Sequence, residues 1–331
     1  LYLMAKKSPK LLMKKEVVVI APPKIETTRV VVIGTGLVGS TAAFTMMAQG
    51  IASEIVLIDV NKDKCLGEAM DLEHGLSFAP ASRVWAGTYA DCRDADVVVI
   101  SAGLGQKLGQ SRLELTKTNA KIITEVVKNV RGYTDKAIIL MVTNPLDVMT
   151  YTALKASGLP NYQVFGTGTT LDSSRFRYLL AEEFGVATES MGAYLMGEHG
   201  DSEVPVYSHI NLMGEPIKSF PEFDKKAVED AYFKTKNAAA EIIAKKGATY
   251  YAIALAVSRI VRAILYDEKH IFPVSVMLTG QYDLNDVCLS TPAVIGRTGI
   301  EKVLEINLSD DELDKLRKSA KIIRDAIDSV R

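Results

Sequence analysis

A run of β-branched residues that ends in a glycine-rich turn constrains this chain more than any other segment. Residues Arg29–Ile33 are almost entirely valine and isoleucine, which is typical of a strand buried on both faces, as in a parallel sheet. The turn Gly34–Gly39 follows, and residues 38–49 then have the composition of a helix closed by Gly50. A second apolar run, Glu54–Ile58, completes a strand–helix–strand unit and predicts parallel strands with helical crossovers.

The same alternation continues further along the chain. Apolar runs at residues 96–101 and 137–142 flank a helical pattern over residues 113–130. We therefore predict an α/β fold in which residues 29–165 form a Rossmann domain with a doubly wound parallel sheet. Residues 166–331 mix helical and strand signals less regularly, which predicts a following α+β substrate and catalytic domain. The segments behind this second prediction are 171–184, 224–246, 248–267, 271–278 and 293–295.

The last helix is predicted to start at Ser309, because Glu312 completes a capping box three residues later. Apolar residues recur after it at spacings of three and four, so one face of this helix is expected to be buried. They are Leu313, Leu316, Ala320, Ile323, Ile327 and Val330.

Bulk composition excludes several classes of function. The 331 residues carry a formal net charge of −1, so no positive field would attract nucleic acid or an anionic membrane. No apolar run approaches the roughly 20 residues that cross a bilayer. Cys65, Cys92 and Cys288 are widely separated, which predicts neither a disulfide framework nor a metal site and favours a cytoplasmic location.

Residues 1–28 are expected to form an N-terminal extension outside the main fold. Lysines dominate the part that precedes Glu16, and Pro22 and Pro23 interrupt the short apolar run Val17–Ile20. A secretory signal would need a longer apolar segment and a small-residue cleavage site.

The glycine-rich turn predicts a dinucleotide site. Gly34 permits the tight turn, Gly36 lets a pyrophosphate approach the backbone, and Gly39 lets the helix pack closely on the strand. Asp59 ends the second strand, where a carboxylate accepts hydrogen bonds from ribose hydroxyls and repels a 2′-phosphate, so NAD is favoured over NADP. The plain alternative is a turn that binds nothing, with Asp59 capping the next helix.

Four polar segments, residues 105–112, 143–147, 171–177 and 197–201, need a common explanation. They read Gly-Gln-Lys-Leu-Gly-Gln-Ser-Arg, Thr-Asn-Pro-Leu-Asp, Leu-Asp-Ser-Ser-Arg-Phe-Arg and Gly-Glu-His-Gly-Asp. In order and spacing, together with the glycine turn, they resemble the lactate/malate dehydrogenase family from Arg29 to the last helix. The resemblance implies reversible hydride transfer between NAD and carbon 2 of a small 2-hydroxy acid.

The resemblance assigns roles that elementary chemistry supports. His199 would be the general acid and base, since imidazole titrates near neutral pH, and Asp172 would bind its other ring nitrogen. Arg175 would hold the substrate carboxylate with its two-pronged guanidinium, and Arg112 would polarise the reacting carbonyl. Asp172 and Arg175 lie three residues apart on a predicted helix, so both can face one pocket.

Binding residues are implied in the same way. Asn144 would bond the reacting oxygen or the cofactor, and Gln106 and Thr249 would line the substrate pocket. The implied cofactor-binding residues are Gly34, Gly36, Leu37, Gly39, Asp59, Gly103, Asn144 and Thr167.

The substrate is predicted from two positions. Family members that act on malate carry an arginine six residues before the loop arginine, whereas this chain has the neutral Gln106. A second carboxylate enclosed there would lose its hydration without an ionic partner. Thr249 also matches the lactate-type members, so (S)-lactate and pyruvate are favoured. Malate and oxaloacetate remain the alternative, because the adjacent Lys107 could supply a cation.

The resemblance also bears on assembly and regulation. It implies a homotetramer with small-molecule substrates as its other partners. Arg177 matches an arginine with which many bacterial members bind fructose 1,6-bisphosphate, but the histidine they use as well is replaced by Gly192, so weak or absent activation is expected.

Two other classes of protein are disfavoured. An NAD-dependent glycosidase of related fold would need a metal site built from cysteine and histidine, which the scattered cysteines do not offer. A non-catalytic NAD-binding protein would have no use for the joint presence of His199, Asp172, Arg175 and Arg112.

Overall fold

The computed structural model describes residues 27–105 and 112–330, and of Arg112 only the backbone. The predictions for residues 1–26, Gln106 and Lys107 therefore lie outside the described residues. In the N-terminal half, six parallel strands form one sheet, in the strand order of a doubly wound fold. Across the sheet they are β3 (Arg83–Ala86), β2 (Glu54–Ile58), β1 (Arg29–Ile33), β4 (Val97–Ile100), β5 (Ile138–Met141) and β6 (Val164–Gly166). The predicted Rossmann sheet is confirmed.

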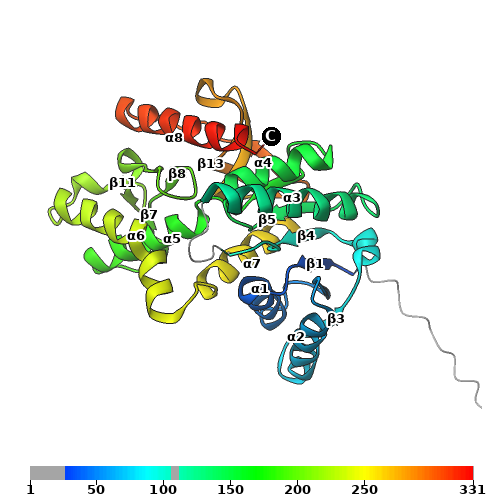
Figure 1. The fold of residues 1–331 in the computed structure, drawn as a ribbon. Helices are drawn as coiled ribbons and strands as arrows, with labels where there is room; N and C mark the ends of the chain where they lie inside the picture. Colours follow the sequence, from blue (N-terminus) through cyan, green and yellow to red (C-terminus); the bar gives the residue numbers. More distant parts are fainter. Residues whose placement is uncertain (1–26, 106–111, 331) are drawn as a thin grey trace, which may run out of the picture.

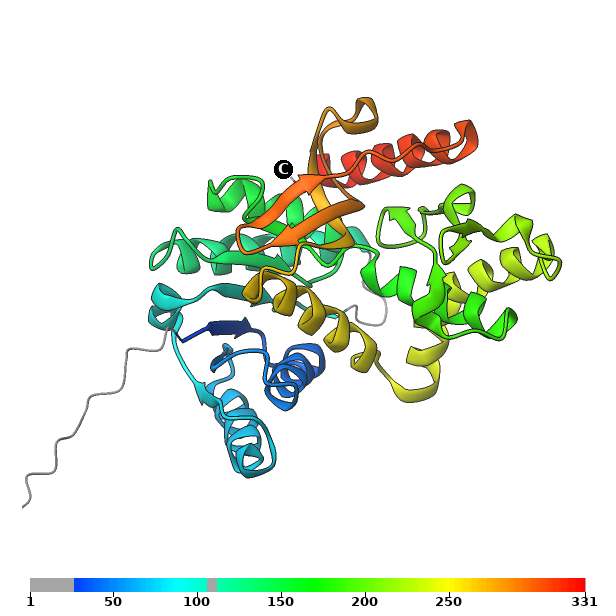
Figure 2. The same cartoon turned by 180° about the vertical axis from the view of Figure 1, so that it is seen from behind.

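Helices cover both faces of this sheet, because each crossover between parallel strands must pass over a face. On one face lie α1 (Leu37–Ala48) and α2 (Lys62–His74), and on the other lie α3 (Arg112–Arg131) and α4 (Leu146–Ser157) (Figure 1). From the C-terminal half, α7 (Tyr251–Leu265) crosses over to pack beside α1 (Figure 2).

The sheet continues into the C-terminal half with antiparallel strands. β12 (His270–Thr279) joins the edge of β6 through the pair Ser275 and Gly166. The strands beyond it are, in order, β13 (Asn285–Gly296), β8 (Leu195–Gly197) and β9 (Glu203–Pro205), with β14 (Gly299–Val303) also paired to β13. A separate small sheet holds β7 (Met191–Gly192), β10 (Asn211–Leu212) and β11 (Glu215–Pro216). This agrees with the expected α+β half, while the division near residue 165 stays a prediction.

The remaining helices begin and end close to the predicted positions. They are α5 (Thr170–Glu183), α6 (Lys225–Lys246) and α8 (Asp310–Asp328). The capping box is present, since Ser309 accepts a hydrogen bond from the Glu312 amide and Glu312 accepts one from the Ser309 amide. The predicted apolar face of α8 packs into the main hydrophobic core.

The main hydrophobic core runs through both halves, and a second, smaller apolar cluster lies around α5, α6 and the small sheet. The valines of β1 are completely buried, as a strand covered on both faces requires, and they share one apolar cluster with β12, β13 and α8. All three cysteines are buried and unpaired. Within the described part of the chain, no helix combines the length and the apolar character that crossing a membrane would require.

Two neighbouring isoleucines on α8 offer a matched test of this packing. Ile323 is 3% exposed and Ile322 is 48% exposed. Ile323→Ala should lower the free energy of unfolding by about 2–4 kcal/mol, because it leaves a cavity in the core. Ile322→Ala should lower it by less than about 1 kcal/mol. Urea unfolding of both variants measures the difference, and equal losses would contradict the described orientation of α8.

Candidate active site

The predicted cofactor residues lie along one edge of the parallel sheet. Each follows the carboxyl end of a strand, which is where open α/β sheets bind ligands. Gly34 and Asp59 come directly after β1 and β2, Gly103 and Asn144 follow β4 and β5, and Thr167 follows β6. The topology therefore brings together five positions that are far apart in sequence.

The glycine turn has the geometry that its sequence predicts. Gly34 has φ +99°, and a Cβ there would lie 2.5 Å from the Ala102 nitrogen of the neighbouring segment. A Cβ on Gly39 would lie 1.9 Å from the Gly34 carbonyl oxygen, so helix α1 packs too closely for any side chain. A Cβ on Gly36 would meet no atom within 4 Å, which leaves the backbone open on the side where a pyrophosphate would approach.

Asp59 holds the glycine turn in place. Its Oδ2 accepts hydrogen bonds from the Thr35 amide at 2.6 Å and the Thr35 hydroxyl at 3.1 Å, and its Oδ1 accepts one from the Asn61 amide at 2.9 Å. Partial burial raises the pKa of Asp59, but the hydrogen bonds from Asn61 and Thr35 outweigh it and hold the pKa below its ordinary value. The carboxylate is therefore charged at neutral pH, as discrimination against a 2′-phosphate needs.

A buried asparagine that sequence reasoning missed connects two of the loops at this edge. Asn119 of α3 accepts a hydrogen bond from the Leu104 amide at 2.9 Å and donates to the Asn144 carbonyl at 2.9 Å. The peptide between Asn144 and Pro145 is cis. A Cβ on Gly103 would lie 2.5 Å from the Thr143 methyl carbon, so the two loops are tightly packed.

The structure brings His199, Asp172 and Arg175 together. His199 Nδ1 lies 2.5 Å from Asp172 Oδ2, and Arg175 Nη1 donates to Asp172 Oδ1 at 2.9 Å. Asp172 and Arg175 lie in the first two turns of α5, directly after β6, and His199 lies in the turn that follows β8. The His199 side chain is 25% exposed, so the ring is held by Asp172 and still reachable from solvent.

In this cluster, charge and burial shift the pKa values of the side chains in opposite directions. Burial raises the pKa of Asp172, but the charge and hydrogen bond of His199 and the charge of Arg175 outweigh it, so the pKa lies below its usual range. Burial lowers the pKa of His199, but the charge and hydrogen bond of Asp172 raise it to about 9, together with the charges of Asp147 and Glu203 when these groups are ionised. The His199 ring is consequently protonated at neutral pH and ready to donate a proton.

Asp147 is a second residue that sequence reasoning did not assign. It is 1% exposed, and its Oδ2 accepts a hydrogen bond from the His199 amide at 2.8 Å while its Oδ1 accepts one from the Ser275 hydroxyl at 2.6 Å. Burial raises the pKa of Asp147 to about 6, against these two hydrogen bonds. Asp147 fixes the backbone of the hairpin turn that carries His199. In the sequence it ends the polar segment 143–147, but no role followed from that position.

The other predicted residues lie on several elements. Arg112 is the first residue of α3, and its side chain lies outside the described residues. Thr249 lies half-buried between α6 and α7, and Leu37 is exposed at the start of α1. Arg177 Nε donates to the Ser173 carbonyl at 3.3 Å. A Cβ on Gly192 would lie 2.4 Å from Asn211 Nδ2, so a histidine there would displace Asn211.

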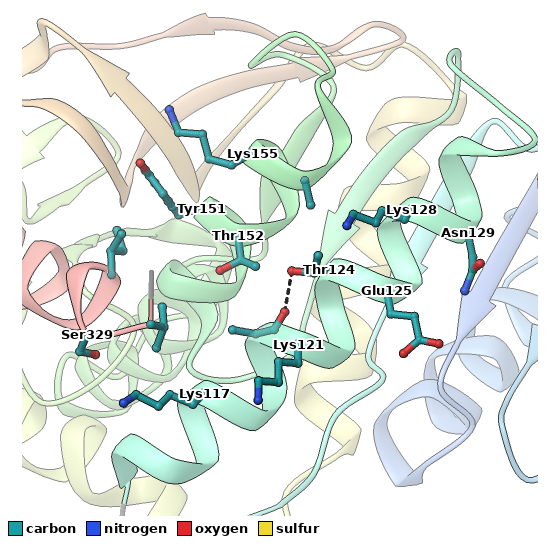
Figure 3. Close-up of a pocket in the computed structure, with 14 residues that line it drawn as sticks. Lys117, Lys121, Thr124, Glu125, Lys128, Asn129, Tyr151, Thr152, Lys155 and Ser329 are labelled. Atoms are coloured by element: carbon teal, nitrogen blue, oxygen red, sulfur yellow. Dashed lines mark hydrogen bonds between the residues drawn. The ribbon is translucent and has the colours of Figure 1, made fainter.

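A wide groove of about 1240 Å³ lies between α3, α4 and the end of α8 (Figure 3). Lys117, Lys121 and Lys128 line it from α3, and Lys155 lines it from α4. None of the predicted site residues is among the residues that line it. Across residues 27–105 and 112–330, no group of three or more histidine, cysteine, aspartate or glutamate side chains could hold a metal ion.

Comparison with known proteins matches both halves of the chain to one family. Residues 28–166 match the model described as lactate/malate dehydrogenase, NAD binding domain. Residues 169–331 match the model described as lactate/malate dehydrogenase, alpha/beta C-terminal domain.

Individual relatives agree with the family models. The chain is 48% identical to an L-lactate dehydrogenase of Bacillus caldolyticus, an alignment that covers 91% of this chain and 96% of that protein. It is 46% identical to an L-lactate dehydrogenase of Synechococcus sp. (strain JA-3-3Ab), over 91% of this chain and 98% of that one. The crystal structure of a minor L-lactate dehydrogenase from Enterococcus mundtii with ligands bound superposes with a TM-score of 0.91 at 40% identity, over 93% and 99% of the two chains.

Removing the charge of Asp172 tests the electrostatics of the cluster. Asp172→Asn should lower the pKa of His199 by about 1–3 units, since an opposite charge in direct contact raises a histidine pKa by that amount. The chain has four histidines, so NMR titration of histidine-labelled protein resolves His199. An unchanged His199 pKa in the variant would show that another group holds the ring proton.

Proposed function

This chain belongs to the lactate/malate dehydrogenase family, and within that family we propose that it catalyses reversible hydride transfer between NAD and (S)-lactate or pyruvate, as an L-lactate dehydrogenase does. The observation that carries the proposal is the contact of His199 with Asp172, next to Arg175, in a chain whose curated relatives are named for that activity. Malate dehydrogenase activity is the alternative that the experiment below addresses.

The cofactor edge of the sheet has the features that NAD requires. The unobstructed backbone at Gly36 and the free amides at the start of α1 would hold the pyrophosphate, and the charged Asp59 would accept the ribose hydroxyls. Gly103, Asn144 and Thr167, at the same cofactor edge of the sheet, would contact the rest of the dinucleotide. When bound, NAD supplies the hydride acceptor for lactate or, once reduced, the hydride donor for pyruvate.

The protein's own groups then move the proton and hold the substrate. During pyruvate reduction, protonated His199 donates its Nε2 proton to the oxygen on carbon 2, and during lactate oxidation the neutral ring takes that proton back. Asp172 holds Nδ1 at 2.5 Å, which fixes the orientation of the ring and stabilises its positive charge. The guanidinium of Arg175 has five N–H donors and uses Nη1 for Asp172, so the others can bind a substrate carboxylate.

Three further residues are proposed for the substrate side of the pocket. Arg112 would stabilise the negative charge that develops on the carbonyl oxygen, and it begins α3, the helix in which Asn119 contacts the cofactor edge. Gln106 and Thr249 would favour the methyl group of pyruvate over a second carboxylate, for the desolvation reason given above. Arg177 is proposed to lack an effective partner for a phosphorylated activator, because Gly192 packs against Asn211.

We further propose that the chain works in the cytoplasm, where three buried unpaired thiols remain reduced. A homotetramer is proposed as the working form. Large apolar side chains stay exposed in pairs one turn apart on two helices, Leu66 and Met70 on α2 and Tyr251 and Leu255 on α7, as a subunit interface would require.

Light scattering coupled to size exclusion tests the proposed assembly. A tetramer should elute with four times the 36.0 kDa mass of one chain. Leu66→Asp together with Leu255→Asp should lower that mass, because buried charges would oppose the interface. An unchanged mass in the double variant would exclude α2 and α7 from the interface, and a monomeric parent protein would refute the proposal.

Substrate preference decides between the two branches of the family. We expect kcat/KM for NADH oxidation to be at least about 100-fold higher with pyruvate than with oxaloacetate, equivalent to about 2.7 kcal/mol of transition-state discrimination. Initial rates with both substrates measure it directly, with NADPH as the cofactor control. Comparable rates, or a preference for oxaloacetate, would replace the lactate assignment with malate.

A further inference from the structure

A buried carboxyl that the proposed reaction does not use lies in the hairpin that carries His199. Glu203 opens β9 and pairs with Gly197 at the end of β8, so His199 lies in the turn between these two residues. Glu203 is 8% exposed, and the Tyr232 hydroxyl donates to its carbonyl at 3.0 Å. Its position is therefore fixed by the same hairpin that positions the histidine.

The Glu203 carboxyl lacks the partners that a buried carboxylate needs. Its Oε1 is buried and accepts no hydrogen bond from any described residue. The cationic groups that interact with Glu203 are engaged elsewhere. His199 and Arg175 both contact Asp172, at 2.5 and 2.9 Å, and Lys236 donates to the Asp201 carbonyl at 2.8 Å. A buried carboxylate without compensating bonds is strongly disfavoured, so the carboxyl retains its proton.

Charged and titratable groups on several elements interact electrostatically with Glu203. They are Asp172 and Arg175 of α5, His199 of the hairpin turn, and Tyr232 and Lys236 of α6. From α8, Glu312 is engaged with Ser208, and Ser319 is engaged with Glu198 and Ser202 of the hairpin turn. Burial and the charge of Asp172 raise the pKa of Glu203, against His199, Lys236 and Arg175, to about 8.

We propose that Glu203 is a positioning residue whose protonated carboxyl permits the substrate carboxylate to bind at Arg175, an inference that rests on the proposed function. Protonated Glu203 adds no charge to a pocket in which Asp172 already offsets one of the two cations, His199 and Arg175. Ionised Glu203 adds a negative charge, which repels the substrate carboxylate and raises the pKa of His199. Substrate affinity at alkaline pH thus depends on two protons, one on His199 and one on Glu203.

The variant Glu203→Gln separates the two protons, because glutamine has the shape of the protonated carboxyl but does not titrate. For pyruvate reduction, log kcat/KM of the parent enzyme should fall at alkaline pH with a slope approaching two protons. The variant should fall with a slope of one, from a lower pH, since its His199 has lost a neighbouring negative charge. At about pH 9.5 the KM of the parent should exceed that of the variant by roughly tenfold, with the two within about threefold at pH 7.

Two controls accompany this comparison. Glu203→Asp keeps a titratable carboxyl and should keep the two-proton slope, while Glu189→Gln removes a charge from an exposed position and should change neither slope nor KM. A one-proton slope in an active parent enzyme, or coincident profiles for the parent and Glu203→Gln, would overturn the role of Glu203 alone. A parent enzyme that reduces no 2-oxo acid would instead refute the proposed function.

A measurement on the parent enzyme covers the case in which Glu203→Gln does not fold. Oxamate, in which an amide nitrogen replaces the methyl group of pyruvate, accepts no hydride and serves as the probe. Calorimetry of its binding to the enzyme with NADH, in two buffers of different ionisation enthalpy, counts protons taken up. At about pH 9.5 we expect uptake of more than one proton per site, which a single titrating group cannot supply. Uptake that stays at or below one proton per site across the alkaline range would overturn the proposal.

Discussion

The hydrogen bonds of Asp147 are the contacts on which the active site most depends. This residue lies in the first turn of α4, at the cofactor edge of the parallel sheet, yet it binds the backbone of His199 and the side chain of Ser275. Ser275 belongs to β12, the strand that extends the sheet into the C-terminal half by pairing with β6. One buried carboxyl therefore fixes the histidine loop relative to both halves of the molecule, and a buried aspartate is tolerated there because both oxygens have donors.

The three buried carboxyls that raise the pKa of His199 have proton affinities that follow from their own partners. Asp172 has two cationic partners, and its pKa lies below the usual range. Asp147 has only neutral donors, and its pKa rises to about 6. Glu203 has an oxygen with no donor and a negative neighbour, and its pKa rises to about 8. Side chains of one chemical type thus become a charged carboxylate, a hydrogen-bond acceptor and a carboxyl that retains its proton at neutral pH, because their environments differ.

Sequence patterns predicted the elements whose burial is uniform or strictly periodic. The valine-rich strands β1 and β4 and the amphipathic helix α8 were predicted close to their observed positions. Helix α4 has no counterpart among the predicted segments, because nearly all its residues are buried and no helical periodicity separates a polar face. Strand β13 begins well before its predicted core, residues 293–295, because the buried polar residues Ser290 and Thr291, followed by Pro292, interrupt its apolar pattern.

The candidate site shows the same contrast. Some of its residues can be recognised from short sequence motifs, and others only from the three-dimensional structure. Residues proposed to contact the substrate or the cofactor lie in short motifs, so His199, Asp172 and Arg175 could be named from sequence. Asn119 and Asp147 act through backbone groups of other segments, and a buried polar residue in an apolar element signals only that some partner exists. Which partner it has follows from strand order, because the antiparallel pairing of β12 with β6 brings Ser275 to Asp147. The proposed catalytic groups can therefore be identified from the sequence, whereas the groups that position them can be identified only once the topology of the sheet is known.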